Sequence, residues 1–204
     1  MSATTRWWWI RHAPVINHGG RIYGHNDVDA DTVSNQACFR ALAAVLPVAP
    51  VWLVTPLRRT SQTLAALVGA MITPEVEPEL MEQNFGVWQG MTHAEILSQR
   101  GAEAHRFWIS PACERPSSGE SFVDVVARVR SATARLSARH RGRDIVAVAH
   151  GGSIRAALAV ALGLDPEIAL RFSVHNISLT RIDHIDLGSG GPAVWRVESV
   201  NVVL

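Results

Sequence analysis

The sequence contains no lysine: all 19 of its basic residues are arginines. This absence excludes a Walker-type phosphate-binding loop, a lysine Schiff base and a lysine nucleophile. Arginine is therefore the only permanent cation, and its planar guanidinium suits bidentate binding of phosphate or carboxylate groups. Codon bias explains the absence more simply than selection for function does, but the chemical exclusions hold in either case.

Cysteines, excess charge of one sign and long apolar runs are also scarce. Cys38 and Cys113 lie far apart in the chain without the spacing of metal ligands, so we expect free thiols in a reducing compartment. No apolar run approaches the roughly 20 residues that cross a bilayer, and the first residues lack a signal-peptide pattern. The formal net charge of +1 disfavours binding to nucleic acid or to an acidic membrane surface. We therefore expect a cytoplasmic protein.

The composition, 48% hydrophobic and 18% charged over 204 residues, predicts one domain that spans residues 1–204. Strand-like apolar runs alternate with helical patterns, which is typical of an α/β fold. We expect a three-layer α/β/α sandwich with a mostly parallel central sheet. The expected strands are 7–10, 51–54, 75–81, 144–149, 173–182 and 193–203, the last two joined by a turn at 188–192; the expected helices are 31–46, 55–71, 121–140 and 154–162, with another starting at 92.

Three of the expected helix starts carry capping residues. Thr55 followed by Pro56 predicts a threonine cap with proline in the first turn. The segment 92–95 has the Thr-x-x-Glu pattern of a capping box. Ser121, with Asp124 three residues later, predicts the cap of the long helix.

Basic and imidazole side chains follow three of the expected strands. Arg11 and His12 follow the first strand, Arg58-Arg59 the second, and His150 the strand at 144–149. The carboxyl ends of parallel strands meet at one edge of the sheet, where ligands bind, so these groups are expected around one pocket. Arginines supply fixed donors for a phosphate group, and a neutral imidazole can attack phosphorus to form a phosphohistidine. No cluster of metal ligands is visible in the sequence.

Five segments, taken in chain order, match the motifs of one known family. Arg11-His12 resembles an Arg-His-Gly signature, and Thr55–Thr63 resembles a Ser-Pro-Leu-x-Arg-Ala-x-Gln-Thr segment. Glu82–Gly90, which contains Glu-x-x-Phe-Gly-x-Trp-x-Gly, resembles a segment that carries an acid/base glutamate. The other two are Gly119-Glu120-Ser121 before the long helix and Val148–Gly152 around the second histidine. In these motifs the chain resembles the histidine phosphatase superfamily, with its phosphoglycerate-mutase-like fold.

The resemblance implies a role for each site residue. His12 is the nucleophile, and Arg11, Arg59 and His150 hold the phosphoryl oxygens. Glu82 protonates the departing alcohol and then takes a proton from water. The resemblance implies no metal and no other cofactor.

These roles predict a phosphomonoesterase that hydrolyses a small phosphorylated metabolite, with a general likeness to α-ribazole phosphatase. A cofactor-dependent phosphoglycerate mutase and a non-catalytic phosphate-binding regulatory protein remain alternatives. The mutase is less favoured, because such enzymes usually carry a longer insertion between the segments of Glu82 and Gly-Glu-Ser. The substrate's identity stays open, and the oligomeric state is compatible with a homodimer.

The loop 15–30 is long for an unstructured connection, which indicates that it binds a ligand or covers the site. His18, Tyr23 and His25 are expected at the rim of the site more than in contact with substrate. Outside this loop, we expect the run Trp7–Trp9 in the core and Arg58 in solvent. Trp88 is expected either in the core or in contact with the substrate, and Gln89 is assigned no role.

Overall fold

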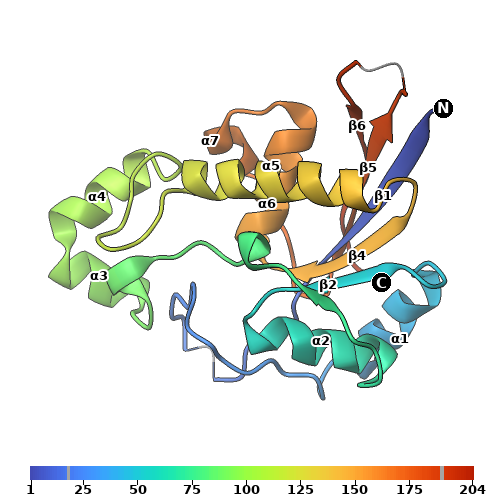
Figure 1. The fold of residues 1–204 in the computed structure, drawn as a ribbon. Coiled ribbons are helices and arrows are strands. Elements are labelled where there is room, and N and C mark those ends of the chain that lie inside the picture. The colour runs from blue at the N-terminus through green and yellow to red at the C-terminus, as the bar shows by residue number, and fades with distance from the viewer. Residues whose placement is uncertain (18, 189–190) are drawn as a thin grey trace.

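The computed structural model describes residues 1–17, 19–188 and 191–204, and its centre is a six-stranded sheet (Figure 1). The strand order is β3-β2-β4-β1-β5-β6. The first four of these strands run parallel, and β5 and β6 add two antiparallel pairings. The predicted mostly parallel sheet is therefore confirmed. The strands are β1 (Ala3–Arg11), β2 (Val51–Val54), β3 (Glu75–Val76), β4 (Asp144–Ala149), β5 (Leu179–Asp186) and β6 (Val194–Val202).

Helices cover both faces of this sheet (Figure 1), so the three-layer α/β/α arrangement is confirmed. α1 and α2 pack on one face, and α5 and α6 pack on the other. α3 and α4 lie beyond the edge of the sheet, at the left of Figure 1. The helices are α1 (Gln36–Val45), α2 (Arg58–Val68), α3 (His93–Gln99), α4 (Gly101–Ile109), α5 (Phe122–Arg139), α6 (Gly151–Leu162) and α7 (Pro166–Ala169), with 3-10 turns η1 (Pro78–Leu80) and η2 (Gly86–Trp88).

The three tryptophans of β1 connect the two cores. Successive side chains of a strand point to opposite faces, so Trp7 and Trp9 enter the core under α5 and α6, while Trp8 packs toward α1 and α2. The Trp7 and Trp9 rings stack with centroids 5.0 Å apart. The expected role of this run in the core is confirmed, and its burial fixes the register of β1 in the sheet.

Two helices begin later than predicted. α1 starts at Gln36 because the Asp31 carboxylate accepts the backbone N–H groups of Val33 and Ser34 and forms a turn there. α2 starts at Arg58, and Thr55 does not cap it as predicted. The Thr55 hydroxyl is instead within hydrogen-bond distance of His150, which places it in the candidate site.

Three more elements depart from their predicted bounds. β3 has only two paired residues before η1, and β5 starts at Leu179 because the chain turns between His175 and Ser178. α6 starts at Gly151, three residues earlier than predicted. At the next residue, a Cβ on Gly152 would displace the carboxylate of Glu82 from its present position. A close approach between backbone and side chain thus overrides the low helix propensity of glycine.

Other predicted elements are confirmed. The capping boxes at Thr92 and Ser121 both form, and β4 has its predicted bounds. His18 and residues 189–190 of the predicted turn lie outside the described residues. None of the helices in the described part of the chain is long and apolar enough to cross a membrane.

Candidate active site

His12 and His150 follow two adjacent parallel strands. Arg11 pairs with Ala149 in the register of β1 and β4, so the next residue of each strand leaves the sheet at the same level. The two imidazole rings lie with their centroids 5.2 Å apart. Both rings are buried, His12 with 6% of its surface exposed and His150 with none. Backbone pairing therefore brings the two predicted histidines together.

The tautomer of His12 follows from its hydrogen bond. Its Nδ1 lies 2.6 Å from the backbone carbonyl of Ala13, and a carbonyl can only accept, so Nδ1 carries the proton. The lone pair of Nε2 is then free for attack. Burial and the neighbouring Arg59 and Arg11 charges lower the pKa of His12 to about 3, although the Ala13 hydrogen bond opposes this shift. The ring is consequently neutral at physiological pH.

His150 is oriented by Thr55 at the carboxyl end of β2. The Thr55 Oγ1 lies 2.9 Å from His150 Nε2, while His150 Nδ1 is buried without a partner among the described residues. Burial lowers the pKa of His150 well below its usual value, and the nearby Arg59 charge adds to the effect. When the Thr55 hydroxyl donates to Nε2, the proton of the neutral ring lies on Nδ1, ready for an anionic acceptor.

Backbone carbonyls hold Arg11 and Arg59, and one nitrogen of each guanidinium group has no hydrogen-bond partner among the described residues. Arg11 donates from one terminal nitrogen to the carbonyl of Val174 at 2.5 Å. Arg59 is 1% exposed and donates to the carbonyls of Asn26 at 2.9 Å and Gly24 at 2.8 Å. The Nε atoms of both arginines are buried without a partner in the described residues. His150 Nδ1 is a third buried nitrogen without a partner in the described residues, on the ring next to His12.

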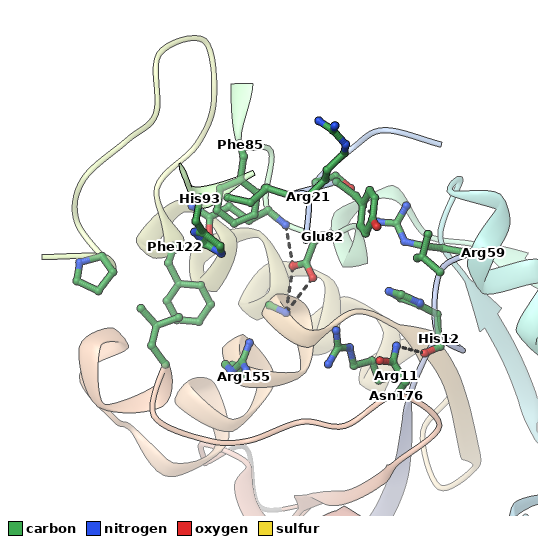
Figure 2. A pocket seen from close by; sticks show the side chains of 18 of the residues that line it. Arg11, His12, Arg21, Arg59, Glu82, Phe85, His93, Phe122, Arg155 and Asn176 are labelled. Carbon is green, nitrogen blue, oxygen red and sulfur yellow. Dashed lines mark hydrogen bonds between the residues drawn. The ribbon is translucent and has the colours of Figure 1, made fainter. Parts of the chain in front are cut away.

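Glu82 lies opposite these groups, on the irregular segment between η1 and η2. Its Oε1 accepts the backbone N–H groups of Gln83 at 2.9 Å and of Gly152 at 3.0 Å, as the dashed lines in Figure 2 show. Gly152 lies in the first turn of α6, whose free N–H groups and dipole favour a negative charge. The carboxylate is thus anchored beside the pocket.

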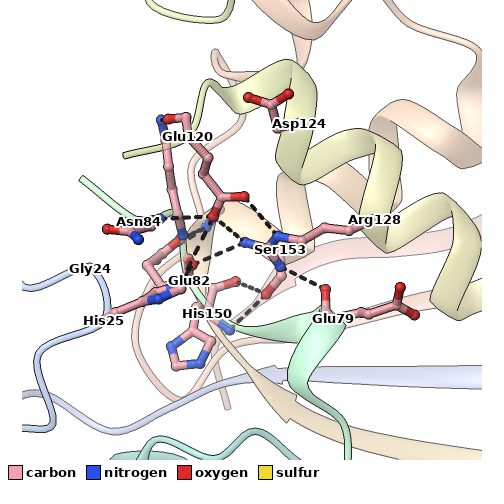
Figure 3. A network of polar contacts seen from close by, with 12 residues as sticks. Gly24, His25, Glu79, Glu82, Asn84, Glu120, Asp124, Arg128, His150 and Ser153 are labelled. Atoms are coloured by element: carbon pink, nitrogen blue, oxygen red, sulfur yellow. Dashed lines mark hydrogen bonds and ion pairs between the residues drawn. The ribbon is translucent and has the colours of Figure 1, made fainter. Parts of the chain in front are cut away.

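An ion pair behind Glu82 holds its segment in place (Figure 3). Arg128 of α5 pairs with Glu120 at 2.8 Å and donates to the carbonyls of Glu79 at 2.6 Å and Glu82 at 3.0 Å. Glu120 also accepts the backbone N–H of Asn84 at 2.8 Å. We call Glu120 and Arg128 the anchor pair, because together they bind the backbone on both sides of the glutamate.

The loop 15–30 joins the two ends of the site. His25 donates from Nε2 to the carbonyl of Glu82 at 2.8 Å, and its backbone N–H binds the side chain of Gln89. Its chain neighbours hold Arg59 through their carbonyls. His25 and Gln89 therefore have connecting roles that the sequence did not reveal.

A cavity of about 550 Å³, much larger than a phosphate group requires, opens beside these groups. The fully buried His150 is not among its lining residues. Arg11, His12, Arg59 and Glu82 line it, and so does Arg155, which sequence reasoning missed. Trp88 is not among the lining residues: it is 1% exposed and packs on Phe107 in a small core with α3 and α4. The core alternative for Trp88 is therefore correct.

Several site groups escaped sequence reasoning for identifiable reasons. Thr55 has the ordinary sequence signal of a helix cap, and Glu120 belongs to a recognised motif that carried no assigned role. Arg155 follows His150 by five residues, a spacing that places it near the same end of α6 and that was a usable signal. Among the described residues, no group of three or more His, Cys, Asp or Glu is arranged to hold a metal ion.

Comparisons with known proteins agree with this geometry. The model of the histidine phosphatase superfamily (branch 1) matches residues 7–198. Glucosyl-3-phosphoglycerate phosphatase of Mycolicibacterium vanbaalenii is 33% identical over 165 residues, which cover 76% of this chain and 73% of that protein. The solved structure of a mycobacterial glucosyl-3-phosphoglycerate phosphatase has a TM-score of 0.83 and 31% identity, with 98% of this chain and 99% of that chain covered.

A bifunctional protein of Mycobacterium tuberculosis is 32% identical over 127 residues, or 62% of this chain. The matched region is 35% of that relative's length, so the two proteins share one part only. The family match runs from β1 into β6, and the solved structure of the phosphatase shares the fold of this chain. This chain therefore belongs to the histidine phosphatase superfamily, branch 1.

Proposed function

We propose that this protein is a phosphomonoesterase that hydrolyses a small phosphorylated metabolite through a phosphohistidine on His12. One observation carries the proposal: Arg11, Arg59 and His150 each have a buried nitrogen without a partner in the described residues, close to a neutral imidazole whose Nε2 is free. A buried donor without a partner costs free energy, and the oxygens of a bound phosphate would satisfy all three. Phosphate is thus the ligand that best fits this end of the cavity.

In the first step, the Nε2 lone pair of His12 forms a bond to phosphorus while the bond from phosphorus to the ester oxygen breaks. Glu82 gives a proton to that departing oxygen, so the leaving group is a neutral alcohol. Positive charge builds on the His12 ring, and the Ala13 carbonyl stabilises it through the Nδ1–H bond. Arg11, Arg59 and His150 bind the charge spread over the phosphoryl oxygens.

In the second step, water attacks the phosphohistidine and the bond between phosphorus and Nε2 breaks. Glu82, now ionised, takes a proton from that water, which returns both residues to their starting states. The products are the alcohol and inorganic phosphate. Because the same carboxylate serves as acid and then as base, its position controls both steps.

The similar proteins named glucosyl-3-phosphoglycerate phosphatase support hydrolysis over transfer to a second acceptor. The segment between Glu82 and Gly119 is short and holds the 3-10 turn η2 and two short helices, α3 and α4, which supports the same choice. A likeness to α-ribazole phosphatase remains a narrower hypothesis about the substrate. A reducing, cytoplasmic location is proposed because the two cysteines are free thiols. The single domain and the homodimer stay predictions.

The test measures p-nitrophenyl phosphate hydrolysis and labelling by a ³²P-phosphomonoester, both in EDTA, for wild type, His12→Ala and Arg58→Ala. We expect wild-type turnover with an acid-labile, base-stable phosphoenzyme, and neither turnover nor label in His12→Ala. Arg58→Ala, whose exposed guanidinium contacts Asp27, is the matched control and should behave as wild type. Substantial turnover by folded His12→Ala would refute the nucleophile, and phosphate binding without any turnover would favour the regulatory alternative.

A further inference from the structure

Arg155 is a pocket arginine that the proposed phosphoryl chemistry does not use. It lies on α6, and its Nε donates to the carbonyl of Phe172 at 2.8 Å, which fixes the direction of the guanidinium. In residues 1–17, 19–188 and 191–204, no carboxylate forms an ion pair with it. Burial lowers the pKa of Arg155, with Glu82 acting in the opposite direction. The cost of burying this charge is therefore only partly offset within the chain.

The position of Arg155 relates it to the ester bond. A Cβ built on Gly151 would lie 3.3 Å from Arg155 Nη1 and 3.6 Å from Arg11 Nε, so both guanidinium groups lie beside that glycine. In the view of Figure 2, Arg155 lies between Arg11 and Phe122. It therefore borders the space between the phosphate and the leaving group.

Part of the cavity wall is apolar, although Arg21, Tyr23, Gln83, His93 and Asn176 also line the cavity. Aromatic and aliphatic side chains from several elements form the apolar part, and a sugar would find few hydrogen-bond partners on them. Such a wall favours a leaving group with an apolar body. The wall residues are Ile22, Phe85, Phe107, Phe122 and Leu170.

We propose that Arg155 binds a carboxylate on the leaving group of the substrate, while the body of that group packs on the apolar wall. This inference rests on the proposed phosphomonoesterase function and narrows its substrate class. A carboxylate fits better than a second phosphate, because Arg155 offers one positive charge. Arg21, which also lines the cavity, already pairs with Glu95 at 3.3 Å. The planar guanidinium also matches the two oxygens of a carboxylate.

The test compares 3-carboxyphenyl phosphate with 3-carbamoylphenyl phosphate, which have similar shape and differ in one charge. Wild type should prefer the carboxylate ester by about tenfold in kcat/KM, the value expected for one charged hydrogen-bonded pair. Arg155→Gln should abolish this preference mainly through KM and leave the carbamoyl ester within about threefold of wild type. Arg155→Lys keeps the positive charge and should keep part of the preference. It still tests the inference if the glutamine variant fails to fold.

Arg171→Gln is the matched control, since it removes one positive charge from an exposed neighbour outside the pocket lining. It should retain the carboxylate preference. Equal losses on both esters in Arg155→Gln would mean that Arg155 binds the transferred phosphoryl group, and would overturn the inference. A wild type that hydrolyses both esters equally would also overturn it while leaving the phosphomonoesterase function intact. Failure to hydrolyse p-nitrophenyl phosphate as well would instead overturn the proposed function, and the inference with it.

Discussion

The phosphate end of the pocket and the Glu82 end are built in different ways. His12 and His150 follow paired strands, so the hydrogen-bond register of β1 and β4 sets their separation. Glu82 lies on an irregular segment whose position depends on the anchor pair, Glu120 and Arg128, and on the N–H of Gly152. His12 is thus placed by backbone structure, and Glu82 by a few polar groups.

This difference has a consequence for how the two ends tolerate change. A sheet register is shared by many residues and resists single substitutions, because one slip would move every side chain of a strand to the other face. A polar network has few members, and the loss of one leaves others unpaired. Substitutions around Glu82 should therefore move its carboxylate while His12 stays in place.

Beyond the loss of all turnover expected for His12→Ala, Arg59→Ala should have the largest effect at the phosphate end. It removes a buried cation from the developing phosphoryl charge, and we expect kcat/KM to fall by about 10³ for every substrate. Steady-state kinetics on p-nitrophenyl phosphate and on an alkyl phosphate measure this. Arg58→Ala controls for loss of a contact with the same loop, through Asp27. A loss below tenfold in Arg59→Ala would show that Arg59 serves only the loop carbonyls.

Glu82→Gln tests the other end. The amide cannot give a proton to the leaving oxygen, so kcat for an alkyl phosphate should fall by about 10². The first step for p-nitrophenyl phosphate should change much less, because p-nitrophenolate departs without protonation. Burst kinetics separate this step from hydrolysis of the phosphoenzyme. Equal losses in the first step for both substrates would remove Glu82 from the acid role.

Glu120→Gln should have a smaller effect of the same kind. It keeps an acceptor for the Asn84 N–H but weakens the pairing with Arg128, and we expect about a tenfold loss on alkyl phosphates. In a Glu82→Gln background the same change should have no further effect on that step, because the acid that it positions is already absent. Additive losses in the double variant would show a general structural role instead.

The acid dependence of stability should give the smallest difference. The native pKa of His12 is lowered to about 3 from an ordinary value of 6.5, so the unfolded chain binds more protons at intermediate pH. Unfolding free energy should therefore fall as pH drops below 6.5, by about 1.4 kcal/mol per pH unit from this residue. Urea unfolding at pH 7, 6 and 5 should show a weaker fall for His12→Ala than for wild type. Identical slopes would contradict a neutral buried ring.

The main outline of the molecule could be predicted from local sequence signals. Apolar runs located β2 and β4, and the capping boxes at Thr92 and Ser121 located two helix starts. The motif around His150 predicted which strand end would meet His12. These features depend on residues close together in the chain, or on a register that burial enforces.

The less accessible features depend on contacts between distant segments. Thr55 is a good helix cap by composition, yet its hydroxyl contacts an imidazole 95 residues later in the chain. The turn after Asp31 and the early start of α6 likewise follow from specific hydrogen bonds and a close approach to Glu82. No local sequence pattern predicts such pairings, because each partner, taken alone, has an ordinary sequence signal.

The sequence by itself determined the α/β fold class, the family resemblance and the residues expected to carry the phosphoryl chemistry, since periodicity and motif order are written along the chain. Only the tertiary structure decided which nitrogens near His12 remain without a partner, how the anchor pair holds Glu82, and that Arg155 lines the cavity. The physical reason is that hydrogen-bond satisfaction and burial are properties of surroundings, and folding assembles those surroundings from remote parts of the chain.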